Sequence, residues 1–193
     1  MVRAAGVASK RLYIYDGVKI PEDPYGRGSG EYRNDPSYGT QSNTKVWVMR
    51  EFKNSEANHL GIPLPKGKVR FYRRNGPQIE FVGENLLDHT AREETVKIYT
   101  GNAFDITGGR VRTSFKGDND RSWADEAFEI KLRNRKAEMV EVRVVEHLYR
   151  GTNWEITGKS NTFLKTDAQT VEFRVQVQPD EEKVVSYSVH YTW

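Results

Sequence analysis

Strict alternation of apolar and polar side chains is the feature that most constrains this chain. Its clearest example is FEIKLRNRKAEMVEVRVVEHL, residues 128–148. Phe128 and Ile130 share one parity in this segment, and Glu129 and Lys131 share the other. Because successive side chains of a β-strand point to opposite faces, such a segment buries one row and exposes the other. The charges are therefore predicted to form the solvated face of a sheet.

Strand-like runs separated by turn residues fill most of the sequence. The runs span residues 11–17, 45–52, 69–71, 79–81, 94–100, 110–116, 128–132, 140–144, 169–177 and 183–193. Turn residues such as those of RRNGP, residues 73–77, lie between them. No window shows a helical period over ten or more residues. The pattern predicts an all-β fold, an antiparallel β-sandwich of about nine to twelve strands.

Two hairpins are predicted from the placement of apolar residues opposite one another. In the first, residues 128–132 pair with 140–144, so that Leu132 lies opposite Val140 and Lys131 opposite Glu141. The last hairpin is predicted in the same way between the two C-terminal runs, with Val171 opposite Tyr191 and Val177 opposite Val185.

Glu146 breaks the pattern of the first hairpin. Val144 and Val145 are adjacent, so continued alternation turns Glu146 toward the core. A β-bulge near residues 144–146, or simply the end of the strand there, would leave the carboxylate in solvent, and this is the interpretation that we favour. The alternative is a buried Glu146 held by a partner.

The N-terminal part of the chain differs in composition from the rest. Residues 21–44 are rich in Gly, Pro, Ser and Asn and are predicted to form a long loop. The run at 45–52 is apolar on both parities, so we expect residues 12–15 to cover its second face. The chain is thus divided into an N-terminal strand and loop at 1–44, packed on or tethered to a β-sandwich domain at 45–193.

Composition bears on the partners that the chain would bind. The chain contains 30 Lys and Arg and 27 Asp and Glu, and its net charge of +3 is spread along the sequence. A nucleic-acid-binding protein usually concentrates its positive charge on one stripe. The absence of cysteine excludes disulfides, thiol catalysis and cysteine-based zinc sites. No apolar run approaches the roughly 18 residues of a membrane span, and the first residues lack the apolar core of a signal peptide. We therefore predict no nucleic-acid partner, no transmembrane segment and no signal peptide in this chain.

Few segments carry the pattern that a catalytic or metal site requires. GRGSG at 26–30 has Arg27 where a nucleophile elbow needs glycine. The four histidines are widely scattered, and the acidic segment 118–129 has Trp123 where a calcium loop needs glycine. No catalytic, cofactor-binding or metal-ligating residue is therefore assigned, and no cofactor is expected.

Six residues are retained as binding candidates. Asp88 and His89 would suit acid–base work, although adjacent residues on a strand point to opposite faces and more naturally cap a turn. Exposed aromatic rings would stack on sugars. The aromatic candidates are Tyr25, Tyr32, Tyr38 and Trp123. Trp47 and Trp154 are predicted to lie in the core instead.

Several motifs follow one another in order along the chain. They are LGIPLPKGKVRFYRR (60–74), FVGENLLDHT (81–90), GNAFDIT (101–107), IKLRNRKAEMVEVRVVEHL (130–148), WEIT (154–157) and the closing strand with its tyrosines. Together they resemble the C-terminal domain of unknown function found in proteins related to the mucoidy inhibitor family, over nearly the whole chain. The resemblance implies an immunoglobulin-like β-sandwich of bacterial origin, in an extracytoplasmic place such as the periplasm or cell envelope. It also implies a longer natural protein with an export signal and an upstream domain, and it brings no established catalytic residues.

The leading functional hypothesis is a non-catalytic interaction or structural module of the bacterial cell envelope. Its partner would be another protein or an upstream domain of the same polypeptide, contacted through strand edges or loops. The alternative is a carbohydrate-binding or enzyme-accessory β-sandwich domain. A hydrolase centred on Asp88 and His89 is a third hypothesis.

Overall fold

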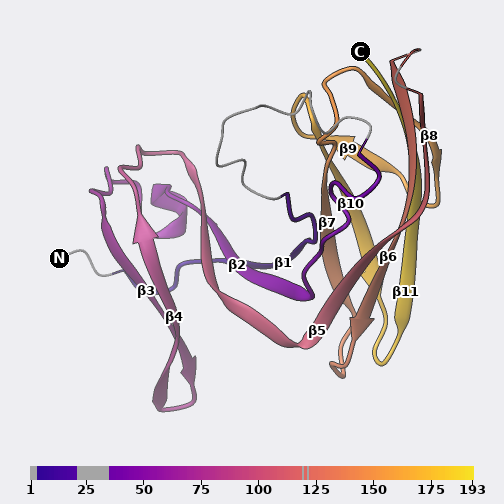
Figure 1. The fold of residues 1–193 in the computed structure, drawn as a ribbon. Helices are drawn as coiled ribbons and strands as arrows, with labels where there is room; N and C mark the ends of the chain where they lie inside the picture. The colour runs from indigo at the N-terminus through magenta and orange to yellow at the C-terminus, as the bar shows by residue number, and fades with distance from the viewer. Residues whose placement is uncertain (1–3, 21–34, 119, 121) are drawn as a thin grey trace. The chain divides into compact units, whose positions relative to one another are not determined.

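The computed structural model describes residues 4–20, 35–118, 120 and 122–193. Strands make up 64% of it, and the described residues form no α-helix, so the chain is all-β as predicted (Figure 1). The strands are β1 (Lys10–Asp16), β2 (Lys45–Lys53), β3 (Gly67–Asn75), β4 (Gln78–Leu87), β5 (Thr95–Asp118), β6 (Trp123–Asn134), β7 (Val140–His147), β8 (Trp154–Lys159), β9 (Phe163–Lys165), β10 (Thr170–Val177) and β11 (Glu182–Thr192). A single 3-10 turn, Glu56–Asn58, follows β2. None of the described helical segments has the length and apolar character needed to cross a membrane.

The chain divides into two compact units, each built from two stretches of sequence. Unit 1 contains residues 1–13 and 47–103, and unit 2 contains residues 14–46 and 104–193. These limits differ from the predicted segments, because β1, β2 and β5 each contribute residues to both units. Nine strands form one sheet in the order β8-β11-β6-β5-β2-β1-β7-β10-β9, and β3 and β4 form a separate two-stranded sheet.

Unit 1 is organised around a small apolar core beneath the β3–β4 hairpin. Phe52, Leu87, Val96 and Ile98 are its buried members. The hairpin turns at Gly76 and Pro77, because Asn75 pairs with Gln78 and Gly76 adopts a positive φ of 59°. The turn predicted at RRNGP is therefore confirmed.

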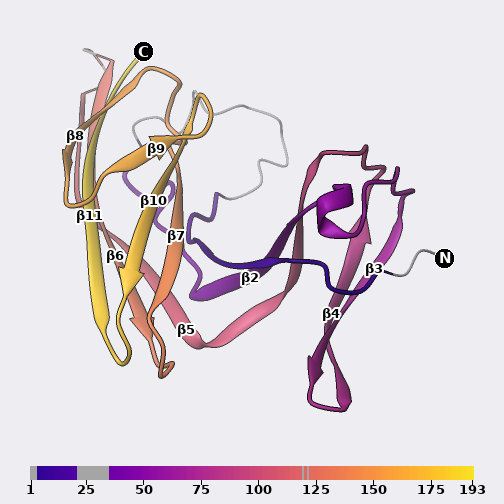
Figure 2. The same cartoon turned by 180° about the vertical axis from the view of Figure 1, so that it is seen from behind.

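The strands of unit 2 lie in two layers, and alternate side chains of these strands are buried between the layers. β6, β8 and β11 lie in one layer and β7, β9 and β10 in the other in both views (Figures 1 and 2). Phe173 of β10 packs against Tyr187 of β11, with ring centroids 5.7 Å apart. Phe128 and Ile130 are buried while Glu129 and Lys131 are exposed, which confirms the predicted faces of this segment.

The predicted pairing of the two hairpins is wrong. β6 pairs with β5 and β11, where Val185 lies opposite Ile130, and β7 pairs with β10, where Val175 lies opposite Val142. The apolar rows that were expected to meet edge to edge within a sheet belong to strands in different layers. Lys131 and Glu141 are therefore not cross-strand partners. Alternation predicts which face of a strand is buried, but it does not say whether the apolar row opposite lies beside it or across the core.

The predicted bulge near residues 144–146 is also wrong. The β7 register with β10 runs without a shift, and Val171 lies opposite Glu146. Alternation therefore continues, Val145 turns outward, and Glu146 is completely buried. The buried carboxylate that was the alternative is the observed arrangement.

The N-terminal strand occupies a different place from the predicted one. β1 is the neighbour of β2 within the large sheet, so it does not cover a face of β2. Trp47 of β2 keeps 37% of its surface exposed, and the prediction that it lies in the core is wrong. Trp154 is half-buried and donates its indole N–H to the Ala168 carbonyl.

Candidate interaction surface

The register of the β3–β4 hairpin decides which of its side chains share a face. Residues that lie opposite one another point to the same side of a two-stranded sheet. Tyr72 pairs with Phe81, and the register shifts between Phe71 and Tyr72, so that Phe71 pairs with Gly83. One face, called here the hairpin face, consists of Lys68, Arg70, Tyr72 and Arg74 of β3 and Ile79, Phe81, Glu84 and Leu86 of β4.

Four large apolar side chains on the hairpin face are exposed to solvent. The exposed fractions are 57% for Tyr72, 64% for Ile79, 58% for Phe81 and 69% for Leu86. The rings of Tyr72 and Phe81 meet edge to face, with centroids 5.7 Å apart. Scattered apolar residues are ordinary on a protein surface, but Tyr72, Phe81 and Ile79 occupy neighbouring positions on this face and form a patch of the kind that marks a binding site.

Basic residues line the β3 side of the same face. Lys68 and Arg70 both contact the Glu84 carboxylate, each at 2.9 Å. Hydrogen bonds from these two residues lower the pKa of Glu84, so the carboxylate is ionised at neutral pH. Within the described part of the chain Arg74 has no ion pair. Three basic residues and one acidic residue give the hairpin face a net charge of +2.

The opposite face of the hairpin has a different role at its two ends. Near the base, Val69 and Phe71 pack against the unit 1 core, and the Phe71 ring lies 6.1 Å from that of Phe52. Near the tip, Arg73 and Glu80 form an ion pair at 2.6 Å. The inner face thus anchors the hairpin, while the apolar residues of the hairpin face lie on its other side.

A second group of polar residues lies buried inside unit 2. This buried ionic cluster consists of Arg110, Arg112, Glu126, Glu146 and Arg150. Arg110 Nε donates to Glu146 Oε2 at 2.8 Å, and Arg150 donates to Glu126 Oε1 at 2.8 Å. All four of these side chains are completely inaccessible to solvent.

Aromatic residues surround the carboxylates of the buried ionic cluster. Tyr187 donates its hydroxyl to Glu146 at 2.6 Å, and Tyr149 donates to Glu126 at 2.9 Å. The Arg110 guanidinium lies 3.8 Å from the centroid of the Phe128 ring. Burial raises the pKa of the Glu146 carboxyl, and the Arg110 charge and the Tyr187 hydrogen bond oppose that effect.

The arginines of the buried ionic cluster also hold one chain segment, residues 35–39. Arg150 donates to the carbonyls of Asp35 and Tyr38, each at 3.1 Å, and Arg110 donates to that of Gly39 at 2.9 Å. Each carboxylate is matched by an arginine and a tyrosine of the same unit. The cluster therefore fixes the interior of unit 2 and the position of this segment.

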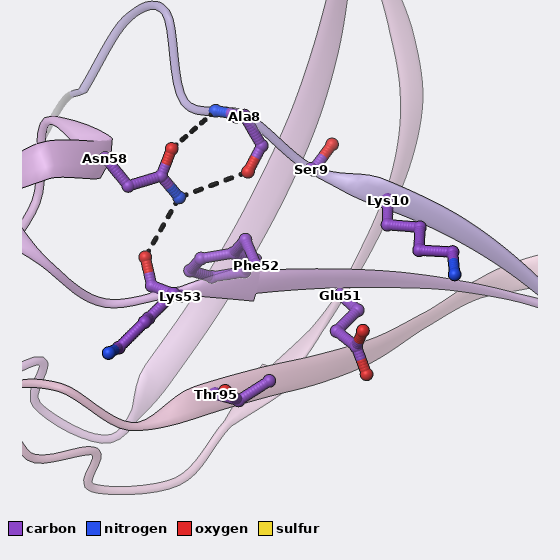
Figure 3. Close-up of a pocket in the computed structure, with 8 residues that line it drawn as sticks. All are labelled: Ala8, Ser9, Lys10, Glu51, Phe52, Lys53, Asn58 and Thr95. Atoms are coloured by element: carbon purple, nitrogen blue, oxygen red, sulfur yellow. Dashed lines mark hydrogen bonds between the residues drawn. The ribbon is translucent and has the colours of Figure 1, made fainter.

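A shallow hollow on unit 1 is the remaining candidate (Figure 3). It is lined by Ala8, Ser9, Lys10, Glu51, Phe52, Lys53, Asn58 and Thr95. The Asn58 amide accepts from the Ala8 N–H at 2.7 Å and donates to the carbonyls of Ala8 and Lys53 at 3.1 and 2.9 Å. The Asn58 side chain is thus already hydrogen-bonded to the backbone of the chain itself.

The described residues among those proposed from the sequence have separate surroundings. Asp88 and His89 are exposed beyond the end of β4, where the His89 N–H donates to Asp88 Oδ1 at 3.0 Å as in a turn. Tyr38 is half-buried against Tyr149, with ring centroids 5.6 Å apart. Trp123 is partly buried and stacks on His190. Tyr25 and Tyr32 lie outside the described residues. A search of the described side chains finds no group suited to hold a metal ion.

Comparisons with known proteins return no match: no protein-family model, no curated protein and no solved structure is similar to this chain. The resemblance to the mucoidy-inhibitor-related domain, the envelope location and the protein partner therefore stay predictions. Function must be inferred from the geometry of the chain, in which the hairpin face is exposed and the buried ionic cluster is closed.

The parity of the apolar residues around the turn would reveal the hairpin face from the sequence. With a two-residue turn at Gly76 and Pro77, Ile79 and Phe81 fall on the face opposite to Val69 and Phe71. Only one of these apolar rows can cover the same core, so the other must be exposed or bound by a partner.

Proposed function

We propose that this protein is a non-catalytic interaction module and that the hairpin face is its contact surface. The observation that carries the proposal is the set of four large apolar side chains, more than half exposed, on one side of β3 and β4. Tyr, Phe and Arg are the residue types enriched at the centre of protein interfaces. The hairpin face offers all three next to one another.

The finer features of the fold belong to the same proposal. The two facing layers of unit 2 agree with an immunoglobulin-like sandwich, a scaffold that often presents binding loops and edges. The resemblance to the mucoidy-inhibitor-related domain favours a bacterial cell-envelope setting, with a protein or an upstream domain of the same polypeptide as partner. Carbohydrate binding is less well supported, because the rings of Tyr72 and Phe81 are inclined at 64° and do not form a flat platform.

Site-specific photo-crosslinking in the cells of origin tests the proposal. A photoreactive phenylalanine at position 81 should give a discrete adduct with one partner. The matched control carries it at position 164, because Leu164 on β9 has a similar exposure of 51% but lies in unit 2. Adducts from position 164 alone, or no adduct from position 81, would rule out the hairpin face as the contact surface.

A further inference from the structure

We propose that the partner presents an extended acidic segment, which adds as a strand along the free edge of β3. The inference rests on the interaction function proposed above and specifies the chemistry of the partner. It follows from the strand edge, from the spacing of the basic side chains and from the charge that they leave unbalanced.

The edge of β3 is open to a partner strand. In the described part of the chain, the small sheet contains β3 and β4 alone, so one side of β3 has no strand partner. Arg70, Tyr72 and Arg74 are exposed along it. An unpaired edge offers backbone N–H and C=O groups to an extended peptide, and recognition by strand addition uses them for affinity.

The side chains of β3 then select which peptide is bound. Lys68, Arg70, Tyr72 and Arg74 occupy alternate positions, about 6.6 Å apart on one face. A strand added beside them places its own alternate side chains next to each of these residues. Acidic side chains fit beside the three basic residues, and an apolar side chain fits beside Tyr72.

Charge separates this partner from other occupants of the hairpin face. A second copy would bring one face of charge +2 against another, with arginine beside arginine. A membrane or a nucleic acid would meet the Glu84 carboxylate in the middle of the face, and the tip formed by Asn75 and Gln78 is polar. A strand at the free edge of β3 instead lies beside the basic residues of β3 and away from Glu84, which is on β4.

Fluorescence polarisation with synthetic peptides tests the inference on the full chain. The probes TETETITET and TETITETET place Glu and Ile at alternate positions for the two strand directions. The controls replace each Glu by Lys, or gather the three Glu residues in one run. We expect the alternating acidic probe in one direction to bind about tenfold more tightly than both controls, because charge and spacing are both matched.

Two protein variants make the result specific to the hairpin face. Arg74→Glu should weaken binding of the acidic probe about fivefold, because an attraction becomes a repulsion. Arg92→Glu makes the same charge change at an exposed position in the turn after β4 and should have little effect. Equal binding of acidic and basic probes, or equal effects of the two variants, would overturn the inference.

Other partner classes give distinct outcomes. The full chain could instead self-associate or bind phosphatidylserine vesicles or single-stranded DNA. Any of these interactions would overturn the inference if Phe81→Ser abolishes it and the acidic peptides do not bind the unmodified chain. The proposed interaction function would survive such a result, provided that position 81 still crosslinks in cells. Loss of that crosslink with intact peptide binding would instead refute the proposed function.

Discussion

Replacing Glu146 by Gln tests whether the buried ionic cluster holds unit 2 together. Gln has the shape of Glu but no charge, so the variant leaves the Arg110 guanidinium buried without its counter-ion. Arg110 Nε contacts both carboxylate oxygens, at 3.2 and 2.8 Å, and the Tyr187 hydroxyl donates to one of them at 2.6 Å. Gln keeps one neutral acceptor oxygen and puts an NH2 donor in place of the other, so these contacts lose the charge and one acceptor. A hydrogen bond to a charged group contributes about 1.5–3 kcal/mol, and breaking one side of a buried pair costs about 3–5 kcal/mol. We therefore expect the free energy of unfolding to fall by about 3–5 kcal/mol.

An exposed pair in the same unit provides the matched control. Arg133 and Glu182 also join Nε to a carboxylate oxygen, but their side chains are 54% and 40% exposed, against 0% for both Arg110 and Glu146. Solvent screens such a pair, so Glu182→Gln should lower the free energy of unfolding far less than Glu146→Gln does. Glu146→Gln and Glu182→Gln are the same chemical substitution, so a difference between their effects reports the burial of the ion pair.

Urea unfolding followed by tryptophan fluorescence gives the two free energies. A Trp47→Phe background leaves tryptophans only in unit 2, at positions 123, 154 and 193, so that the signal reports this unit. The double variant Arg110→Met with Glu146→Leu should recover part of the lost stability, because no charge is then buried alone. Equal losses for Glu146→Gln and Glu182→Gln would refute the reasoning.

Three further perturbations follow from single contacts. Gly39→Ala should destabilise unit 2 by about 1–3 kcal/mol in the same urea assay. Gly39 has a φ of 72°, and an added Cβ would clash with the Tyr149 ring. An unchanged urea midpoint would contradict this packing of Gly39 against Tyr149. The hydrogen bond that His147 Nε2 donates to the Asp16 carboxylate raises the pKa of His147 in the folded state. Its stabilising contribution is therefore present below about pH 6.5 and is lost as the pH rises through the raised pKa. His147→Gln should therefore lower stability by up to about 1 kcal/mol at pH 5.5 and by less at pH 8.5, and a larger loss at pH 8.5 would contradict the assignment. Phe81→Ser should change thermal stability by less than about 0.5 kcal/mol, because the ring is exposed, whereas a large loss would place Phe81 in the core.

Burial along single strands could be predicted from this sequence, but pairing between strands could not. Phe128, Ile130 and Glu129 lie on the predicted faces because alternation is a local property of one strand. The partner of β6 depends on which strands share a layer, and the apolar rows of β7 and β11 satisfy the alternation equally well.

The buried ionic cluster and the hairpin face escaped prediction for different physical reasons. The bulge expected at Glu146 rests on the cost of burying a carboxylate, and this cost is offset by Arg110, which is 36 residues away in sequence. Arg110 itself looks like an ordinary member of an alternating strand. The hairpin face escaped prediction because Ile79 and Phe81 alternate like core residues, and only the two-residue length of the turn at Gly76 and Pro77 separates them from the face of Val69 and Phe71.

A crosslinking scan along β4 tests the role of the hairpin face most directly. The register shift near Phe71 places residues 79, 81, 84 and 86 on the hairpin face, and residues 80 and 85 on the opposite side. A photoreactive residue introduced at each position in turn should therefore join the partner at 79, 81, 84 and 86 and stay silent at 80 and 85. Equal adducts on both sides of the hairpin, or adducts at 80 and 85 alone, would contradict the account.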